Sequence, residues 1–407
     1  MSPRLLVITG WIVAGTVLTA WPQKLVPLPG SGVEYSPPGH PPSYMAFSPD
    51  SSVLVASRGS ELDVWDVASR RLLANVSGHE GRVWELEFSP DGKWLASGDV
   101  YGQIHLWRLL DRWQGLRPVE LSPPTPGGLK GDHAGQHAGE QTNRWTKVFL
   151  AFSPDSTALA WATRPIYSPA RTGEPQIHLL EIHVLSLPAV QQVAIASWKQ
   201  AGSVFPTDIA FSPDGRQLWL VYLHLQRTRE AIKVASWDAV PDSGQLRPLR
   251  STLAGVFKRD IGSELVRFEA GGRLLAAVNT AGLVTVLDMR SGQRGAVCRV
   301  ARVSARRQYA FSADGRLLAA SVPAGPDLAA LSGSVGRVMA IWDTRTGAVV
   351  CQLLHPGACE VFPGAFSPDR RYLATVVRYP AAPEGRPSHF LWELPETPAT
   401  DTAYGQR

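Results

Sequence analysis

One short pattern recurs seven times along the 407-residue chain and limits the folds open to it. In each copy an apolar run ends in phenylalanine, and a turn, in most copies Ser-Pro-Asp, leads to a second apolar run. Proline presets φ in such a turn, while Asp and Gly tolerate the remaining dihedrals. The seven phenylalanines are Phe47, Phe88, Phe152, Phe211, Phe268, Phe311 and Phe366. Such a repeat predicts one supersecondary unit per copy, stacked on its neighbours.

Each copy also continues in a way that predicts four short strands. Alternating apolar positions before and after the turn indicate the first two strands. A third run ends in tryptophan or leucine and a polar residue, as in LDVWDV and MAIWDT, and a short turn then leads to a fourth run. Four strands every forty residues or more are typical of a propeller blade. We therefore predict an all-β fold over residues 23–395, a seven-bladed β-propeller of four-stranded antiparallel sheets.

Motifs at the ends of the predicted strands resemble those of the WD-repeat family. Gly78-His79 stands before a first strand. A Trp-Asp pair ends three of the third strands, at Trp65-Asp66, Trp237-Asp238 and Trp342-Asp343. The resemblance covers residues 24–395, and it identifies the chain as a divergent member, of a bacterial type with an N-terminal membrane or export segment.

The resemblance also implies a polar network inside one blade. Members of the family join a histidine, an aspartate, a serine or threonine and the tryptophan by buried hydrogen bonds. His79, Ser97 and Trp107 match three of these positions, and Tyr101 stands where the aspartate is expected. We therefore expect most blades to be held by apolar packing between neighbouring sheets rather than by complete polar networks.

The last blade supplies only three predicted strands, because residues 396–407 form a polar tail. An open ring would leave exposed sheet edges, which invite pairing with other chains. Propellers of the resembling family usually close by lending an N-terminal strand to the final blade. We therefore predict that a strand from residues 23–38, either KLVPL or SGVEY, completes the ring.

The N-terminus holds a separate apolar segment. Residues 5–21 carry no charge and follow Arg4, which makes them too apolar for a solvent-facing part of a soluble domain. We assign residues 1–22 to one apolar helix, a signal peptide or a transmembrane anchor, and favour a retained anchor because Leu18 makes a poor cleavage site. The expected location is therefore membrane-anchored or secreted, with the propeller outside the cytoplasm and membrane contact through 5–21 only.

Composition and charge exclude several classes of site. The formal net charge of +5 is spread along the chain, so we expect no nucleic acid partner, which would need a clustered basic stripe. The three cysteines are Cys298, Cys351 and Cys359, too few for a disulfide framework, and we expect free thiols. Neither the run from Cys351 through His355 to Cys359 nor the pair His133 and His137 makes a convincing ligand set. We expect no metal and no cofactor.

Long insertions are expected on one face of the propeller. They are Ser122–Asn143, Arg164–Pro175, Val322–Gly336 and Arg378–Ser388. The first lies between two blades and the others between second and third strands, positions that emerge on the same side. Because random drift should lengthen loops on both faces, this concentration indicates a binding surface for a protein or peptide. Four arginines of this face offer contacts to an acidic partner: Arg299, Arg302, Arg306 and Arg307.

Two classes of function remain. The chain shows no nucleophile elbow, metalloprotease helix motif, phosphate-binding loop or dinucleotide fingerprint. We therefore expect a non-catalytic protein–protein interaction scaffold and no enzyme. The alternative is a propeller hydrolase or oxidoreductase with a site in the axial channel, and three or more titratable side chains clustered there would favour it.

Overall fold

A computed structural model of the chain describes the propeller strands and the shorter connections between them. The described residues are 25–28, 44–109, 116–119, 146–165, 177–187, 189–201, 203–226, 229–239, 246–249, 265–269, 271–278, 283–295, 298–299, 309–323, 337–354, 360–378 and 388–394.

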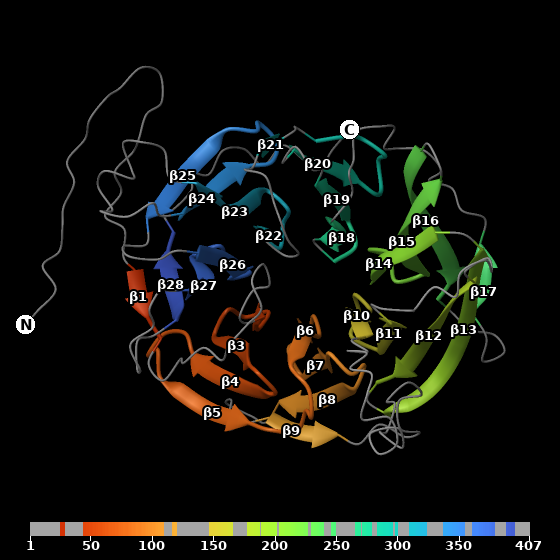
Figure 1. Cartoon of the computed structure of the whole chain (residues 1–407). Helices are drawn as coiled ribbons and strands as arrows, with labels where there is room; N and C mark the ends of the chain where they lie inside the picture. Colours follow the sequence, from red (N-terminus) through yellow and green to blue (C-terminus); the bar gives the residue numbers. More distant parts are fainter. Residues whose placement is uncertain are drawn as a thin grey trace, which may run out of the picture.

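Seven four-stranded antiparallel sheets stand in a ring, which confirms the predicted propeller (Figure 1). Blade 1 holds β2 (Met45–Phe47), β3 (Val53–Arg58), β4 (Glu61–Asp66) and β5 (Leu72–Val76). Blade 2 holds β6 (Val83–Phe88), β7 (Trp94–Asp99), β8 (Ile104–Leu109) and β9 (Leu116–Val119). Blade 3 holds β10 (Thr146–Phe152), β11 (Ala158–Pro165), β12 (Ile177–Ser186) and β13 (Gln191–Ala201). Blade 4 holds β14 (Ser203–Phe211), β15 (Gln217–Gln226), β16 (Arg229–Asp238) and β17 (Arg247–Leu249).

The other three blades complete the ring. Blade 5 holds β18 (Leu265–Glu269), β19 (Leu274–Val278), β20 (Leu283–Asp288) and β21 (Cys298–Arg299). Blade 6 holds β22 (Tyr309–Phe311), β23 (Leu317–Pro323), β24 (Arg337–Asp343) and β25 (Val349–Leu354). Blade 7 holds β26 (Glu360–Phe366), β27 (Tyr372–Arg378), β28 (His389–Glu393) and β1 (Leu25–Pro27).

The ring is closed by β1, as predicted from the first of the two candidate stretches. β1 pairs antiparallel with β28 in the register Leu25↔Trp392, Val26↔Leu391 and Pro27↔Phe390, and in Figure 1 the red strand lies beside the blue one. The next residue, Leu28, is fully buried in an apolar cluster that contains side chains of both blade 7 and blade 1. The closing segment therefore completes one sheet and also packs against the next.

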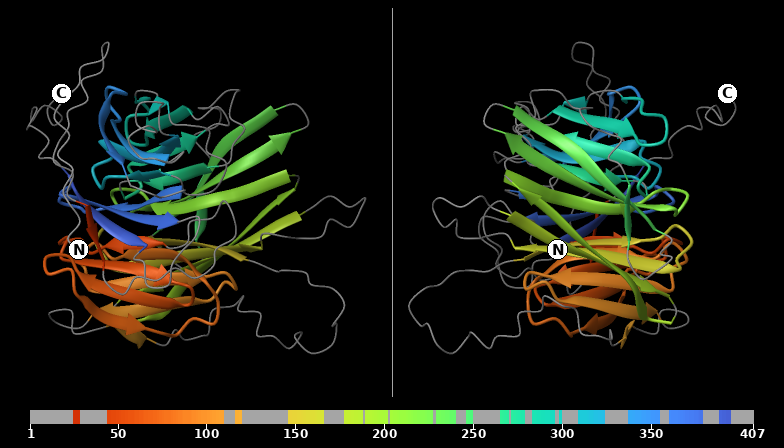
Figure 2. Two further views of the ribbon diagram at one scale, coloured as in Figure 1. Left: turned by 60° about the vertical axis from the view of Figure 1, so that its left-hand side comes forward. Right: turned by 90° about the vertical axis from the view of Figure 1, so that its right-hand side faces the viewer.

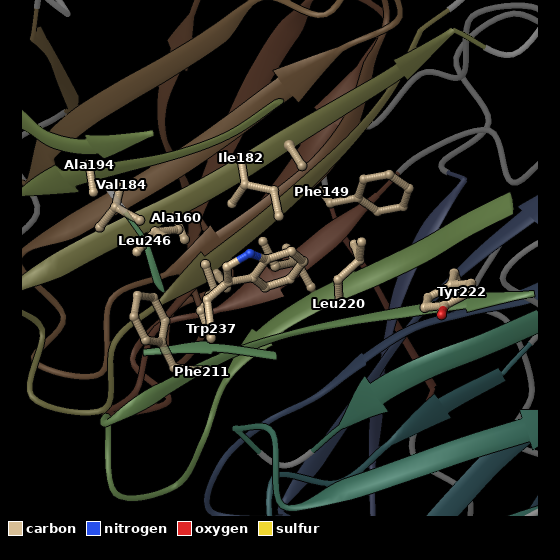
Figure 3. Packing of buried hydrophobic residues seen from close by; sticks show 14 residues of the cluster. Phe149, Ala160, Ile182, Val184, Ala194, Phe211, Leu220, Tyr222, Trp237 and Leu246 are labelled. Carbon is tan, nitrogen blue, oxygen red and sulfur yellow. The ribbon is translucent and has the colours of Figure 1, made fainter. Parts of the chain in front are cut away.

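Apolar contacts between neighbouring sheets make up the core. Figure 3 shows one such cluster, in which Phe149 and Ile182 of blade 3 meet Phe211 and Trp237 of blade 4. Both faces of a blade are buried in this way, because each sheet stands between two others. Apolar residues therefore fill both alternating positions of an inner strand such as β11, and period-two patterning is weak there.

Five consecutive strands of blades 3 and 4 are longer than the strands of the other blades. β12 to β16 have nine to eleven residues each, and Figure 2 shows them as the long green strands. Only residue 202 separates β13 from β14. β15 and β16 are the second and third strands of blade 4. The turn between them therefore lies on the same face as the other connections from a second to a third strand.

The first turn of each blade repeats one construction. In six blades an Asp oxygen accepts a hydrogen bond from the Ser hydroxyl two positions earlier, at 2.5–2.7 Å. The next residue has a positive φ and is glycine, or else Ser51, Ser156 or Arg370. The hydroxyl of Ser51 accepts from the backbone N–H of Asp369 at 3.0 Å, and that of Ser156 from the N–H of Asp91 at 2.9 Å. These two turns therefore bind blade 7 to blade 1 and blade 2 to blade 3.

The polar network of blade 2 contains four residues rather than three. His79 Nε2 lies 2.6 Å from Ser97 Oγ, and the indole N–H of Trp107 donates to the same oxygen at 2.7 Å. His79 Nδ1 lies 3.3 Å from Asp99 Oδ2. One set of protons satisfies all three contacts: Nδ1–H donates to the carboxylate, and the Ser97 hydroxyl donates to Nε2. The expectation that Tyr101 occupies the aspartate position is wrong, because Asp99 fills it.

Asp99 belongs to the end of β7, where its carboxylate closes the following turn. One oxygen accepts from the backbone N–H groups of Tyr101 and Gln103, both at 2.9 Å, and the other from that of Gly81 at 3.2 Å. The side chain of Tyr101 is 49% exposed and lies over Gly81, where a β-carbon would come within 2.6 Å of its ring. Tyr101 is therefore a turn residue on the surface, outside the network.

Several sequence-based predictions fall outside the described residues. They concern the apolar segment 1–22 and the tail 396–407. Among the described residues no helix is long and apolar enough to cross a membrane. Cys351 is a free thiol whose pKa is raised to about 11 by burial, Cys298 is described by its backbone, and Cys359 is not described.

Replacing Ser97 by alanine should destabilise the propeller strongly. The change removes the hydroxyl that serves both His79 and Trp107, and it leaves two buried nitrogen atoms unsatisfied, at about 1–3 kcal/mol each. We expect a loss of about 2–4 kcal/mol in the free energy of unfolding, measured by urea titration. Thr375→Val is the matched control, because the Thr375 hydroxyl of blade 7 accepts a single hydrogen bond, from the indole N–H of Trp392 at 2.9 Å. Equal losses in the two variants would contradict the shared role of Ser97.

Candidate functional site

The arginines predicted to contact a partner are only partly described. Arg299 lies on β21, where its backbone pairs with Leu283 of β20. Arg302, Arg306 and Arg307 lie outside the described residues, as do most residues of the four insertions. His79, Ser97 and Trp107 lie together inside blade 2, in the network given above. The prediction that the four arginines form one contact surface therefore stays a prediction.

A charged cluster that the sequence did not lead us to expect lies at the centre of the ring. It comes from the first strands of four blades, β6, β10, β14 and β18, which surround the axis in Figure 1. Its members are Glu85, Glu87, Lys147, Asp208 and Arg267, and we call them the axial cluster. The cluster meets our criterion of three or more titratable groups in the axial channel.

Arg267 connects blades that are three positions apart in the ring. Its Nη2 lies 3.4 Å from Glu85 Oε1 of blade 2, and its Nε lies 3.5 Å from Asp208 Oδ2 of blade 4. Glu85 and Asp208 are both buried, and the side chain of Arg267 is 23% exposed. One guanidinium group therefore joins blade 5 to blade 2 across the axis and to blade 4 beside it.

The carboxylates of the cluster also satisfy backbone groups of the next blade. The first strand of each blade is the inner edge of its sheet, so some of its N–H groups have no strand partner. Asp208 Oδ2 accepts from the N–H of Phe268 at 2.9 Å, and Glu87 Oε1 accepts from the N–H of Phe152 at 3.3 Å. Both bonds run to the repeat phenylalanine of the following blade. The acidic side chains therefore bind neighbouring blades together.

Lys147 makes the corresponding contact between blades 3 and 4. Its Nζ donates to the carbonyl oxygen of Thr207 at 2.9 Å and lies 4.5 Å from the centre of the Phe149 ring. The ammonium group is thus held by a backbone dipole and an aromatic face. The charged contacts run without a break from blade 2 to blade 5.

Burial and mutual repulsion set the protonation of the cluster. Burial raises the pKa of Glu87 to about 8, and the charges of Glu85 and Asp208 act in the same direction. Burial also raises the pKa of Asp208, although the charge of Arg267 opposes this. Burial acts to lower the pKa of Arg267, but Asp208 and Glu85 outweigh it and the pKa is raised. With a pKa of about 8, Glu87 is protonated at neutral pH, and the guanidinium group of Arg267 faces Glu85 and Asp208.

A signal for this cluster does exist in the sequence. The residue before each repeat phenylalanine is alanine in five blades, at Ala46, Ala151, Ala210, Ala310 and Ala365. The two exceptions are Glu87 and Arg267, of opposite charge and three blades apart. Aligned copies would have shown two large charged side chains where the other copies have a methyl group.

The described residues contain no group of three or more His, Cys, Asp or Glu side chains arranged to hold a metal ion. The contacts of the axial cluster given above join its charged side chains to one another and to backbone groups of neighbouring blades.

Comparison with known proteins shows which of them this chain is similar to. The family described as "WD domain, G-beta repeat" matches residues 70–108, which include the network of blade 2. The periodic tryptophan protein 2 homolog of Neurospora crassa is 34% identical over 82 residues, which are 20% of this chain and 9% of that protein. The homolog of Mus musculus is 24% identical over 291 residues, which are 60% of this chain and 29% of that protein. The chain thus spans less than a third of these relatives.

A solved structure extends the likeness to the whole ring. The β-propeller domain of Cps50 (Swd1) from Myceliophteria thermophila superposes with a TM-score of 0.53, covering 92% of this chain and 100% of that domain at 14% sequence identity. At this identity the likeness concerns the fold alone. Residues 70–108 are thus similar to the WD40 repeat, and the closed ring of seven sheets has the β-propeller fold.

Proposed function

We propose that the chain is a non-catalytic scaffold that binds a protein or peptide on the face of the ring that carries the insertions. The proposal is supported by the related WD-repeat proteins, which are non-catalytic scaffolds for protein interactions. It is supported equally by the difference between the two faces of the ring. We take this difference as the observation that carries the proposal.

The two faces differ in the length of their connections. The first turns of the blades, all on one face, have four or five residues each, as at 48–52 and 367–371. On the other face, β9 is followed by 120–145, β11 by 166–176 and β17 by 250–264 before the next strand begins. A rigid ring with long connections on one side suits recognition, because the scaffold holds the ends of each connection in place.

The axial cluster is the observation that favours the alternative, an enzyme with an axial site. Glu87, whose pKa is raised to about 8, lies near two further acidic side chains, and acid–base catalysis uses a carboxyl group with a pKa raised in this way. Against this, each described member of the cluster already contacts another member or the backbone of a neighbouring blade. We therefore propose that the cluster binds the blades of the scaffold together.

We propose further that residues 5–21 deliver the propeller to the outside of the cytoplasm. The support is the absence of any charge across this apolar run, with Arg4 before it.

Binding on the insertion-bearing face predicts that residues 122–143 contribute to partner recovery. Replacing them by a flexible Gly-Ser linker should reduce the partners recovered by crosslinking and pull-down, because the contact surface is lost while both flanking strands remain. The matched control replaces residues 240–245, a connection on the opposite face, in the same way. Unchanged recovery without 122–143 would remove this insertion from the binding surface. Equal loss in both variants would indicate general damage to the fold.

The assignment of the axial cluster predicts a specific pH dependence of stability. The pKa of Glu87 is about 8 in the folded chain and lies near 4.5 when unperturbed, so the folded state holds a proton that the unfolded state releases between these values. Stability should therefore fall as pH rises from 4.5 to 8, by at most about 1.4 kcal/mol per pH unit.

Glu87→Gln should make this slope shallower, because an amide keeps the hydrogen-bonding shape of the protonated acid without titrating, and the raised pKa of Asp208 contributes the remainder. The measurement is urea unfolding at several pH values, with the exposed Glu80→Gln as the control. A slope as steep in Glu87→Gln as in the wild type would contradict the protonation of Glu87 in the folded ring. A chemical activity of the purified chain that Glu87→Gln abolishes would favour the enzyme.

The role of residues 5–21 predicts the fraction in which the chain is found. The full chain should sediment with membranes and dissolve in detergent, and external protease should digest its propeller in intact cells. A variant without residues 1–22 should stay in the cytosol. Recovery of the full chain from the cytosol would contradict both the anchor and the export signal.

A further inference from the structure

The face opposite the insertions carries a row of arginines at equivalent positions. The last residue of the first turn is arginine in four consecutive blades, at Arg216, Arg273, Arg316 and Arg371, and we call these residues the arginine arc. All four side chains are exposed. The same position holds Ser52, Lys93 and Thr157 in blades 1, 2 and 3, so the arc is a property of one side of the ring.

A shared backbone contact fixes where each member of the arc stands. The carbonyl oxygen of Arg273 accepts from the N–H of Met289, and that of Arg316 accepts from the N–H of Thr344, both at 2.8 Å. Arg371 and Arg216 accept in the same way at 2.7 and 2.8 Å. Because each bond joins the first turn of a blade to the end of its third strand, the four arginines leave the ring at matching places.

Adjacent members of the arc approach one another around blade 6. A side-chain nitrogen of Arg273 donates to the carbonyl oxygen of Asp314, and Arg316 Nε lies 4.0 Å from Asp314 Oδ2. Arg370 of blade 7 reaches the same carboxylate oxygen at 3.1 Å. Guanidinium groups from blades 6 and 7 therefore contact the carboxylate of Asp314, and one from blade 5 contacts its backbone carbonyl group. Further exposed arginines on the turns of blades 5 and 6 are Arg290, Arg294 and Arg345.

The acidic residues of these turns are held by their own backbone. Asp214, Asp314 and Asp369 each accept from the N–H of the arc residue two positions later, at 3.0–3.1 Å. Asp288 and Asp343 accept N–H groups of their turns in the same manner. Further acids at the ends of strands on this side are Asp238, Glu269 and Glu393. The described charges of this face are therefore nearly balanced in number, and the four arc arginines are exposed together with Asp214 and Asp369.

This balance decides between two kinds of acidic partner. A nucleic acid binds mainly through long-range attraction to a net positive surface, which a nearly balanced face does not supply. Pairs of guanidinium and carboxylate groups act at short range and are directional, often with two parallel hydrogen bonds. A run of acidic side chains in an extended protein segment fits exposed arginines that stand at regular places along an arc.

We propose that the arginine arc binds an acidic segment of a protein, on the face opposite to the proposed insertion-bearing surface. The chain would then hold two partners, or two parts of one partner, on opposite sides of the ring. The inference does not depend on the insertions, because it uses only described residues of blades 4 to 7.

The test measures binding of a fluorescein-labelled oligoglutamate peptide to the purified full chain by fluorescence anisotropy. The combined variant Arg273→Gln, Arg316→Gln and Arg371→Gln should weaken binding roughly tenfold or more. Each exposed ion pair adds a modest amount to the binding free energy, and three pairs are lost. The matched control removes three positive charges from the same face of blades 1 and 2, through Arg71→Gln, Lys93→Gln and Arg117→Gln. This control should change the dissociation constant by less than about twofold, because exposed charges away from the arc contribute little to binding.

Added salt should weaken binding to the wild type, as expected for exposed ion pairs. Equal loss in the two triple variants would overturn the proposal, because it would show a response to net charge alone. No binding of the peptide at low salt would also overturn it, as would tighter binding of an RNA oligonucleotide of the same charge. If the triple arc variant has a lower melting temperature than the wild type, the double variant Arg216→Gln and Arg371→Gln replaces it in the same binding measurement.

Discussion

The structure depends on the pairing of β1 with β28, which turns a row of seven sheets into a closed ring. Only residues 25–27 form this strand, yet without it the buried Leu391 and Trp392 would lie on an open edge. Leu28 extends the closure into the core between blades 7 and 1, and the bond from Asp369 to Ser51 strengthens the same junction. Closure therefore rests on three kinds of contact: a backbone ladder, apolar burial and a hydrogen bond between turns.

Closure also creates the axial cluster. Arg267 and Glu85 are separated by 182 residues in sequence and meet only because blades 2 and 5 face the same axis. A buried ion pair contributes little net stability, since desolvation offsets much of the attraction, but removing one partner is costly. The cluster therefore favours this arrangement of blades, because one that separated Arg267 from Glu85 and Asp208 would leave buried charges without their counterparts.

Local signals in the sequence were enough to predict the blades, and they failed where distant residues meet. The Phe and Ser-Pro-Asp repeat indicated the seven sheets, because turn geometry and strand patterning are encoded within a few residues of each other. The aspartate of the blade 2 network was misplaced by two positions, since Asp99 also closes a turn and Tyr101 lies beside it on the surface. The axial contacts between Arg267 and its partners depend on the curvature of the ring, which no local pattern records.

Because of the same curvature, a single position of the repeat can define a whole surface of the ring. In a closed ring, equivalent residues of successive blades lie along an arc, so one substitution repeated in neighbouring copies builds a continuous surface. Arg216, Arg273, Arg316 and Arg371 form such a surface on tight turns, whose backbone bonds hold them at matching places. The insertions on the other face differ from one another in length and composition. One scaffold therefore supports two kinds of surface: a regular arc set by the repeat, and irregular loops set by individual blades.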